Sequence, residues 1–454
     1  MKCVFKNIIR GFFACIALGF VFSAYANTNN NIVMKIHRWK TANGATVYFV
    51  RVPSLPMLDV RAVFAAGSAY DGKSYGLASL TSSMIGEGST AQNANQIAAT
   101  FDRVGAKFNI SAGRDMVVVS LRSLTDPKYL IPALATFSSA LTKATFPLKA
   151  LQREKNRAIA ALHVEQQEPN EVASNAFYAA VYRKQAYAHQ PLGTITSVKR
   201  LTREKVSTFY NRYYVARNAS IVLVGDLTSR KAKKIARLIS QGMHAGARAK
   251  GLKQAAMLTK PLDRHIIFPA KQTTVILGQV GITRRNSDYF PLIVGNYAFG
   301  GLPLSSILFR QVRDNRGLAY YAGSSFRPLR YRGPFIITFQ TRANKAKEAL
   351  AVVQQALKDY VDNGPTEAQL DAAKQNLIGS FPLALATNSD IAGVLTRIAF
   401  YHQSLNYLDR YRTKVAAVTR EQVKVAFEKL IHPNKMVTIL VGPTVKKTEV
   451  APNE

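Results

Sequence analysis

Cysteine is nearly absent from this chain. Its 454 residues include only two cysteines, Cys3 and Cys15. Both lie in an N-terminal segment that has three basic residues, an apolar run over 12–24 and the sequence Ala24-Tyr25-Ala26. This order is typical of a secretory signal peptide, so we predict that residues 1–26 are removed. The mature chain would then hold no cysteine and no disulfide, which suits an oxidising compartment such as a bacterial periplasm.

Long hydrophobic runs are missing as well. The run over 12–24 is shorter than the roughly 20 apolar residues that a spanning helix needs, and no other stretch reaches that length. We therefore expect no stable membrane span after signal cleavage, and a periplasmic mature protein. Retention of the segment as an uncleaved anchor is the alternative.

Acidic residues are few, because 26 Asp and Glu stand against 61 Lys and Arg, a formal net charge of +35. Such a balance attracts polyanions. The basic residues are spread along the chain, and the densest runs, Arg230–Lys234 and Arg248–Lys253, accompany no zinc-finger, RNA-recognition or helix-turn-helix signature. We predict no nucleic-acid partner. We interpret the charge as a solvated basic surface or as a face complementary to an acidic partner chain.

Histidine and the common hydrolytic motifs are also scarce. There are seven histidines, and the closest pair in sequence, His244 and His265, are 21 residues apart. No two therefore share a helical turn, where neighbouring imidazoles could bind one zinc. The G-x-S-x-G and S-x-x-K motifs of serine hydrolases are absent. A zinc site assembled only in three dimensions is the remaining alternative.

An internal repeat is present. The sequences LTREKV (201–206) and VTREQV (418–423) each lead, through an asparagine, to an apolar run that ends in glycine, at Gly225 and Gly442. The threonine precedes its glycine by 23 residues in both copies. Threonine favours a helix N-cap, and the apolar run reads as a buried strand. The repeat predicts two similar α+β domains of about 200 residues each.

The remaining pattern supports this organisation. Asn43-Gly44 predicts a hairpin turn between strands at 36–40 and 46–52, and alternating polarity over 58–64 predicts a half-buried strand. We expect strands at 117–121 and 335–339. The helices expected are 76–86, 132–141, 151–162, 345–357 and 367–378. We place the N-terminal domain at 27–240, a Gly/Ala/Lys-rich linker at 241–263, the C-terminal domain at 264–445 and a tail at 446–454.

Two segments carry a family resemblance. They are Gly76–Thr90, GLASLTSSMIGEGST, and Gly300–Tyr321, GGLPLSSILFRQVRDNRGLAYY. With the residues between about 35 and 443, they resemble the pitrilysin/insulinase zinc peptidase family. Active members have a first segment like G-[LI]-A-H-F-L-E-H-M-x-F-x-G-T.

The resemblance places serine at all three H-x-x-E-H positions, as Ser79, Ser82 and Ser83. A neutral hydroxyl is a poor zinc ligand, and serine cannot accept a proton near neutral pH as the family's glutamate does. The family's third ligand, a glutamate on a later helix, aligns with 159–162, where both candidate positions are alanine. The resemblance therefore implies no metal in this chain.

The second segment keeps the family's residues. In the family, an arginine and a tyrosine seven residues later face the zinc, orient the substrate and stabilise charge on the scissile carbonyl. Arg313 and Tyr320 fall on these positions. Gly300 and Gly301 resemble a glycine turn that lets a substrate strand approach. Ile307 departs from the family, which often has arginine there. The alternative is a surface arginine and a core tyrosine.

These resemblances imply a fold and a function. We expect each half to be a mainly antiparallel sheet packed with helices, the two halves facing each other in the manner of a clamshell. We expect the noncatalytic, substrate-positioning subunit of a heterodimeric zinc metallopeptidase that degrades or processes peptides in the bacterial envelope. A homologous partner would carry the zinc, the substrate would be an unfolded peptide, and this chain alone would be inactive. The alternative is a stand-alone peptide-binding or escort protein.

Overall fold

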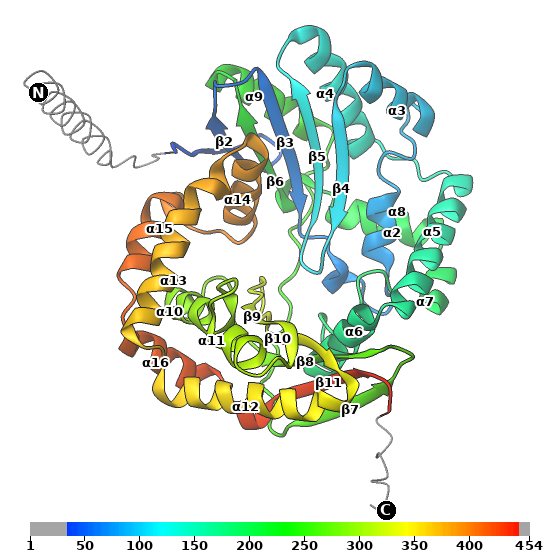
Figure 1. Cartoon of the computed structure of the whole chain (residues 1–454). Coiled ribbons are helices and arrows are strands. Elements are labelled where there is room, and N and C mark those ends of the chain that lie inside the picture. The colour runs from blue at the N-terminus through cyan, green and yellow to red at the C-terminus, as the bar shows by residue number, and fades with distance from the viewer. Residues whose placement is uncertain (1–33, 445–454) are drawn as a thin grey trace, which may run out of the picture. The chain divides into compact units, whose positions relative to one another are not determined.

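The computed structural model describes residues 34–444, and the chain from Lys35 onward forms one compact unit. Two β-sheets, each packed with helices, make up this unit (Figure 1). The expected α+β class is confirmed. The predicted signal peptide, 1–26, and tail, 446–454, lie outside the described residues. Within the described part, no helix combines the length and the apolar character needed to cross a bilayer.

Each half of the chain forms one sheet. The first, in spatial order, contains β1 (His37–Lys40), β2 (Thr46–Arg51), β6 (Ala219–Gly225), β3 (Met57–Phe64), β5 (Val117–Leu124) and β4 (Lys107–Ala112). The second contains β7 (Leu262–Ile267), β11 (Val437–Gly442), β8 (Gln272–Val280), β10 (Pro334–Arg342) and β9 (Ala319–Phe326). Strand neighbours are antiparallel except for β2 with β6 and β7 with β11. Apart from β1, the strands of the two sheets correspond one to one: β2, β6, β3, β5 and β4 match β7, β11, β8, β10 and β9. The predicted duplication is therefore confirmed.

The helices of the first half are α2 (Leu77–Ser83), α3 (Ala94–Arg103), α4 (Pro127–Thr142), α5 (Leu148–Gln167), α6 (Pro169–Tyr182), α7 (Ile195–Lys199), α8 (Arg203–Tyr213) and α9 (Ser229–Gln241). Those of the second half are α10 (Tyr289–Asn296), α11 (Ile307–Phe309), α12 (Ala346–Asn363), α13 (Glu367–Ser380), α14 (Asn388–Phe400), α15 (Tyr407–Ala416) and α16 (Arg420–Leu430). Short turns of helix are η2 (Ser68–Tyr70), η3 (Ala216–Asn218), η6 (Ala343–Lys345), η7 (Phe381–Leu385) and η8 (Pro433–Lys435). Two are π-helical, η4 (Tyr297–Gly301) and η5 (Arg310–Asp314).

The repeated threonines begin equivalent helices. Thr202 Oγ1 accepts from Lys205 N at 3.3 Å at the start of α8, and Thr419 Oγ1 accepts from Gln422 N at 3.2 Å at the start of α16. These bonds satisfy backbone N–H groups that the first turn leaves free. The apolar run after each helix is a sheet strand, β6 or β11. The N-cap and strand predictions are confirmed at both copies.

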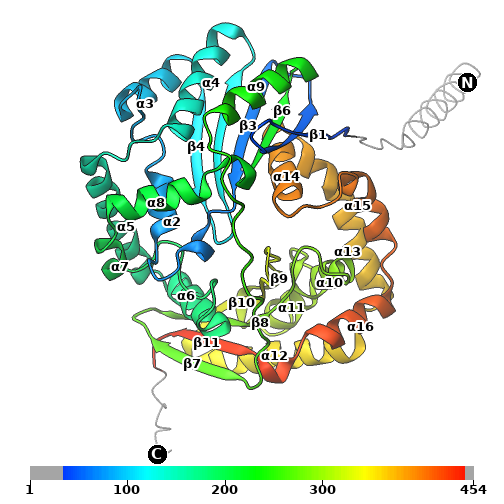
Figure 2. The same ribbon diagram turned by 180° about the vertical axis from the view of Figure 1, so that it is seen from behind.

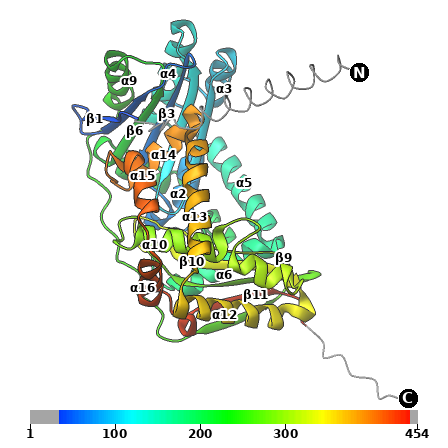
Figure 3. The same cartoon turned by 60° about the vertical axis from the view of Figure 1, so that its left-hand side comes forward.

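Each half lends one helix to the other half's sheet. Helix α6 packs on β8 and β11, and α14 packs on β3 and β6 (Figure 2). Phe177 of α6 belongs to the same buried cluster as Ile276 and Ile439. Figure 3 shows α14 beside the strands of the first sheet. The packing of the halves therefore crosses the sequence boundaries 27–240 and 264–445.

The covering helix α14 changes the prediction for β3. The alternating pattern predicted one solvated face, but both faces are largely buried. Val63 packs with Phe400 at the end of α14, and Arg61 Nη2 donates to the Ser389 carbonyl at 2.8 Å. The half-buried prediction was wrong because a helix from more than 300 residues later covers the polar face.

The connection between the halves is packed as well. It runs from the end of α9 to β7, whose first two residues overlap the predicted linker 241–263. Ala255 and Leu258 are buried in the same cluster as α6. The His244 carbonyl accepts from Ala216 N at 2.8 Å. The segment has a composition that is typical of a solvated linker, but its apolar side chains pack against α6.

Candidate functional site

Helix α2 carries the three serines that stand at the zinc-motif positions. It begins at Gly76, whose backbone is left-handed (φ 89°) and whose added Cβ would lie 2.5 Å from the Leu192 carbonyl oxygen. Only glycine fits at such a position. The carboxylate of Asp71 accepts from Gly76 N at 2.8 Å and from Ala78 N at 2.7 Å. A buried carboxylate therefore fixes the start of this helix.

The serine hydroxyl groups are all engaged by backbone carbonyls. Ser79 Oγ donates to the Pro191 carbonyl at 2.7 Å, Ser82 Oγ to the Ser79 carbonyl at 2.7 Å and Ser83 Oγ to the Leu80 carbonyl at 3.0 Å. Serines that donate to the preceding turn of their own helix are held in place and do not converge on a common point. None of the three serines offers an imidazole or a carboxylate to a metal.

These residues do not fit a zinc ion. Among residues 34–444 there is no group of three or more His, Cys, Asp and Glu side chains that could hold a metal. Ala160 and Ala161, at the positions of the third ligand, are exposed on α5, which packs against α2. Zinc sites need imidazole, thiolate or carboxylate ligands, and neither the three serines nor the two alanines offer one.

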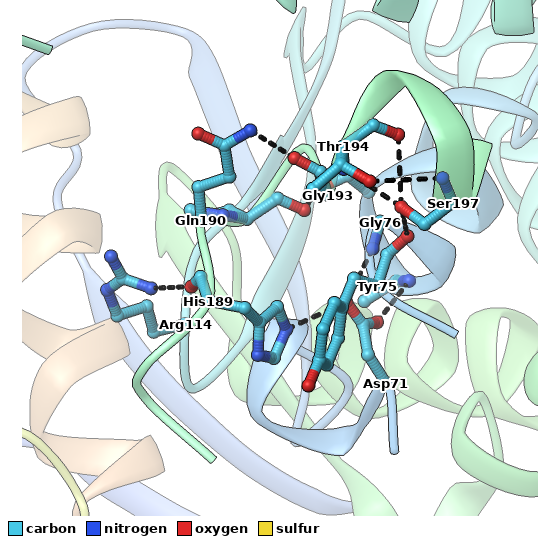
Figure 4. A network of polar contacts seen from close by, with 12 residues as sticks. Asp71, Tyr75, Gly76, Arg114, His189, Gln190, Gly193, Thr194 and Ser197 are labelled. Atoms are coloured by element: carbon cyan, nitrogen blue, oxygen red, sulfur yellow. Dashed lines mark hydrogen bonds and ion pairs between the residues drawn. The ribbon is translucent and has the colours of Figure 1, made fainter. Parts of the chain in front are cut away.

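A polar network that the sequence did not reveal surrounds the start of α2 (Figure 4). His189 Nε2 lies 3.1 Å from Asp71 Oδ2, and its ring stacks on Tyr75 at 4.3 Å between centroids. Arg114 Nη1 donates to the His189 carbonyl. Burial raises the pKa of Asp71, while the hydrogen bonds from His189 and Ala78 oppose the rise. In the sequence, His189 lies more than 20 residues from every other histidine, so no local motif marks it.

The Asp71–His189 pair has a structural use. An aspartate that orients a histidine also occurs in serine hydrolases, where the histidine contacts the nucleophile. Here the Ser79 hydroxyl donates to the Pro191 carbonyl instead. Gly193 has φ 79°, and an added Cβ would lie 2.4 Å from the Tyr75 carbonyl oxygen. The pair thus ties the 189–193 loop to α2. Gly76 and Gly193 both have positive φ, and these two glycines are the signal from which the contact between the loop and α2 could have been found.

Arg313 and Tyr320 are brought together by a turn. Arg313 lies in η5, and Gly317, with φ 57°, reverses the chain into β9, where Tyr320 lies. The Arg313 guanidinium carbon is 5.2 Å from the centre of the Tyr320 ring and 4.7 Å from that of Phe309. Tyr320 is 84% exposed, which excludes the alternative of a core aromatic. Both side chains can therefore meet a ligand from solution.

A cavity of about 430 Å³ lies beside Tyr320. Helix α6 forms one side of it through Ser174 and Phe177, and strands β8, β9 and β10 form the rest. At its polar wall, Asn170 Oδ1 accepts from Thr274 Oγ1 at 3.1 Å and from Gln340 Nε2 at 2.9 Å. Its position beside the exposed tyrosine makes it part of the candidate site.

The two glycines have a different environment from the one expected. Gly300 is buried in η4, and an added Cβ would lie 2.3 Å from Ser324 Oγ and 2.6 Å from Ser324 N on β9. The strand that approaches Gly300 is therefore the chain's own β9, which corrects the expectation of a substrate strand there. Gly301 is half-buried, and its nearest neighbours are Tyr297 and Asn296.

The serine set and the arginine–tyrosine pair are separate. The serine hydroxyls of α2 donate only to carbonyls of α2 itself and to the Pro191 carbonyl. Arg313 contacts Phe309 and Tyr320 instead. In the described part of the chain, no hydrogen bond or ring contact joins the two sets. The two sets are therefore separate features of the described structure.

Comparisons with family models match both halves. Residues 49–195 match the model for insulinase, peptidase family M16, and residues 200–377 match the model for the peptidase M16 inactive domain. Among curated relatives, the uncharacterized zinc protease YmxG of Bacillus subtilis is 23% identical over 359 residues, covering 79% of this chain and 86% of the relative. The non-peptidase homologue YmxG of Helicobacter pylori is 22% identical over 375 residues, covering 81% and 85%.

Solved structures agree with this assignment. A peptidase M16 inactive domain from Pseudomonas fluorescens superposes with a TM-score of 0.88 at 38% identity, covering 91% of this chain and 99% of that one. A protease from Helicobacter pylori superposes with a TM-score of 0.83 at 18% identity, covering 90% and 100%. With the shared fold, the matched models and the degenerate zinc motif, the chain belongs to the insulinase (M16) peptidase family.

Proposed function

We propose that this chain is the noncatalytic, substrate-positioning subunit of a heterodimeric zinc metallopeptidase of the bacterial envelope. A homologous partner would bind the zinc and activate water, and this chain would bind unfolded peptide. The proposal rests on one contrast. At the zinc-motif positions, every serine hydroxyl donates a hydrogen bond to a backbone carbonyl. Tyr320, by contrast, is 84% exposed beside Arg313.

The chemistry of Arg313 and Tyr320 suits this role. A guanidinium and a phenol hydroxyl are hydrogen-bond donors, and donors held toward a developing oxyanion lower the barrier of peptide hydrolysis. Arg313 is half-buried against Phe309, which limits its conformations. A pre-positioned donor costs less to organise at the moment of reaction.

An extended peptide could add to a free strand edge. Strand β4 lies at the end of the first sheet and pairs only with β5, so its outer N–H and C=O groups are available among the described residues. Main-chain pairing at such an edge binds many sequences, which suits a subunit that handles unfolded peptide. The naming of the Helicobacter pylori relative as a non-peptidase homologue is consistent with this role.

The test is reconstitution with a zinc-bearing homologue. The chain would be purified alone and after co-expression with an H-x-x-E-H homologue, and cleavage of an unstructured fluorogenic peptide would be followed with and without chelator. We expect chelator-sensitive cleavage only in the co-expressed sample. Arg313→Ala and Tyr320→Phe should each lower kcat by about 10²-fold, the cost of one oxyanion donor.

The matched control is Arg316→Ala. Arg316 is exposed three residues after Arg313 and donates only to Gln311 among the described residues, at 2.9 and 2.6 Å. It should leave kcat unchanged. Full activity of the Arg313 and Tyr320 variants would refute the positioning role. A chain that binds extended peptide but assembles with no zinc-bearing homologue would be a stand-alone peptide-binding or escort protein.

A further inference from the structure

Five arginines lie on segments that meet near the end of α14. Arg38 lies on β1, Arg217 in η3 and Arg248 in the connection between α9 and β7. Arg285 lies between β8 and α10, and Arg330 between β9 and β10. We call these five residues the arginine patch. None of them belongs to the site of Arg313 and Tyr320.

Several contacts hold the arginine patch together. Arg248 Nε donates to the Arg217 carbonyl at 3.1 Å, and the Arg330 guanidinium carbon lies 5.5 Å from the centre of the Phe400 ring at the end of α14. His402 follows two residues later, with its imidazole partly covered by its neighbours. Its pKa is lowered first by burial and then by Arg330, Arg248, Arg38 and Arg285. Ala249, next to Arg248, packs against the cluster that contains Phe400 and Tyr401, and the guanidinium carbon of Arg284, next to Arg285, lies 5.0 Å from the centre of the Tyr401 ring. The segments that carry these arginines therefore meet at the end of α14.

The arginine patch has no acidic counterpart among the described residues. None of its guanidinium groups forms an ion pair with a carboxylate of residues 34–444. The buried Asp115 lies near Arg330, but its oxygens already accept from the hydroxyls of Tyr187 and Tyr401 and from Arg330 N. Clustered like charges cost free energy, so the patch would gain from a bound anion.

We propose that the arginine patch binds the phosphate groups of anionic lipid headgroups and holds this protein at a membrane surface. Guanidinium groups bind phosphate through paired hydrogen bonds. Four members of the patch are exposed, namely Arg38, Arg217, Arg248 and Arg285. They can therefore contact phosphate groups on an open surface, and a bilayer presents its headgroup phosphates on such a surface.

The test is co-sedimentation of the chain from residue 27 with vesicles. Vesicles of phosphatidylglycerol and phosphatidylcholine should bind the protein, vesicles of phosphatidylcholine alone should not, and added salt should weaken binding. The double variant Arg38→Glu with Arg248→Glu should bind about 30-fold less, since each basic residue at an anionic surface contributes about 1 kcal/mol and the two losses add.

The control changes the same charge elsewhere. Arg230→Glu with Lys234→Glu alters two exposed basic residues of α9, and it should stay within about twofold of the parent because α9 lies outside the patch. An equal loss in both double variants would mean that only net charge matters and would overturn the proposal. So would binding to inorganic phosphate or duplex DNA without binding to vesicles. Thermal unfolding of each variant separates lost binding from lost folding. Neither vesicle outcome depends on peptidase activity.

Discussion

At the scale of the residue, the serines of α2 show how a motif can lose its chemistry and keep its structure. Ser82 is 4% exposed and donates within its own helix, so it has become part of the packing. Reversing the substitutions would therefore not recreate a metal site. The helix start is held by Asp71, the space next to Ser79 is taken by the Pro191 carbonyl, and Ala160 and Ala161 supply no third ligand.

We predict that Ser79→His, Ser82→Glu and Ser83→His combined will bind no stoichiometric zinc. The buried glutamate would lack a partner, and the free energy of unfolding should fall by about 3 kcal/mol or more. Metal analysis after dialysis and urea unfolding measure the two effects. Ser83→Ala is the control and should change stability by about 0.5 kcal/mol or less, because it removes only one bond to the preceding turn. A stable variant with one bound zinc would contradict this account.

At the scale of the element, the decisive contacts join segments that are distant in sequence. The turn between β4 and β5 carries Asp115, which is 4% exposed. It accepts from Tyr187, from Arg330 N at 2.7 Å and from Tyr401 at 3.1 Å, and the last two come from the second half of the chain. One carboxylate thus connects the two halves at the place where α14 ends.

We predict that Asp115→Asn lowers the free energy of unfolding by about 1–3 kcal/mol, because the amide NH₂ cannot accept from the donors that face it. Burial raises the pKa of Asp115, and hydrogen bonds from Tyr187, Arg330 N and Tyr401 oppose the rise. Urea unfolding checks the value. Asp126→Asn, at the N-cap of α4, is a control within the first half and should leave the contact between halves intact. Unchanged stability in Asp115→Asn would show that the carboxylate is not needed.

Prediction from sequence succeeded for elements with local signals. Thr202 and Thr419 begin their helices because an N-cap bond is made within three residues. Prediction failed for β3, because α14 covers the face that was expected to be solvated. The predicted helix at 76–86 also ran past Ser83, where α2 ends. Alternation of polar and apolar side chains describes a strand's own faces. It does not reveal a helix that arrives later in the chain and pairs with Arg61.

At the scale of the whole molecule, buried tyrosines make the stability of the folded state depend on pH in the alkaline range. Burial raises the pKa of Tyr210 and of Tyr411 to about 12. In an unfolded chain a tyrosine has a pKa of about 10. The folded state therefore holds the phenol proton more tightly, and its contribution to stability is complete below pH 10 and lost as the pH rises through 12.

We predict that unfolding becomes easier across this pH window. Tyrosinate absorbance and circular dichroism followed together would detect it. Tyr210→Phe should make the dependence shallower, at the cost of the bond from Tyr210 Oη to the Leu141 carbonyl, 2.7 Å long. A stability that does not change between pH 10 and pH 12 would contradict the burial of these phenols.

The sequence by itself determined the duplication, the helix starts and the absence of an H-x-x-E-H motif, because each depends on residue types and spacings within a few turns of chain. Tertiary structure decided the rest. The exchange of α6 and α14, the burial of β3 and the arginine patch all depend on where distant segments meet. The exposure of Tyr320 likewise follows from the path of β9 at the edge of its sheet. Such meetings are set by the packing of the whole chain, which no local pattern contains.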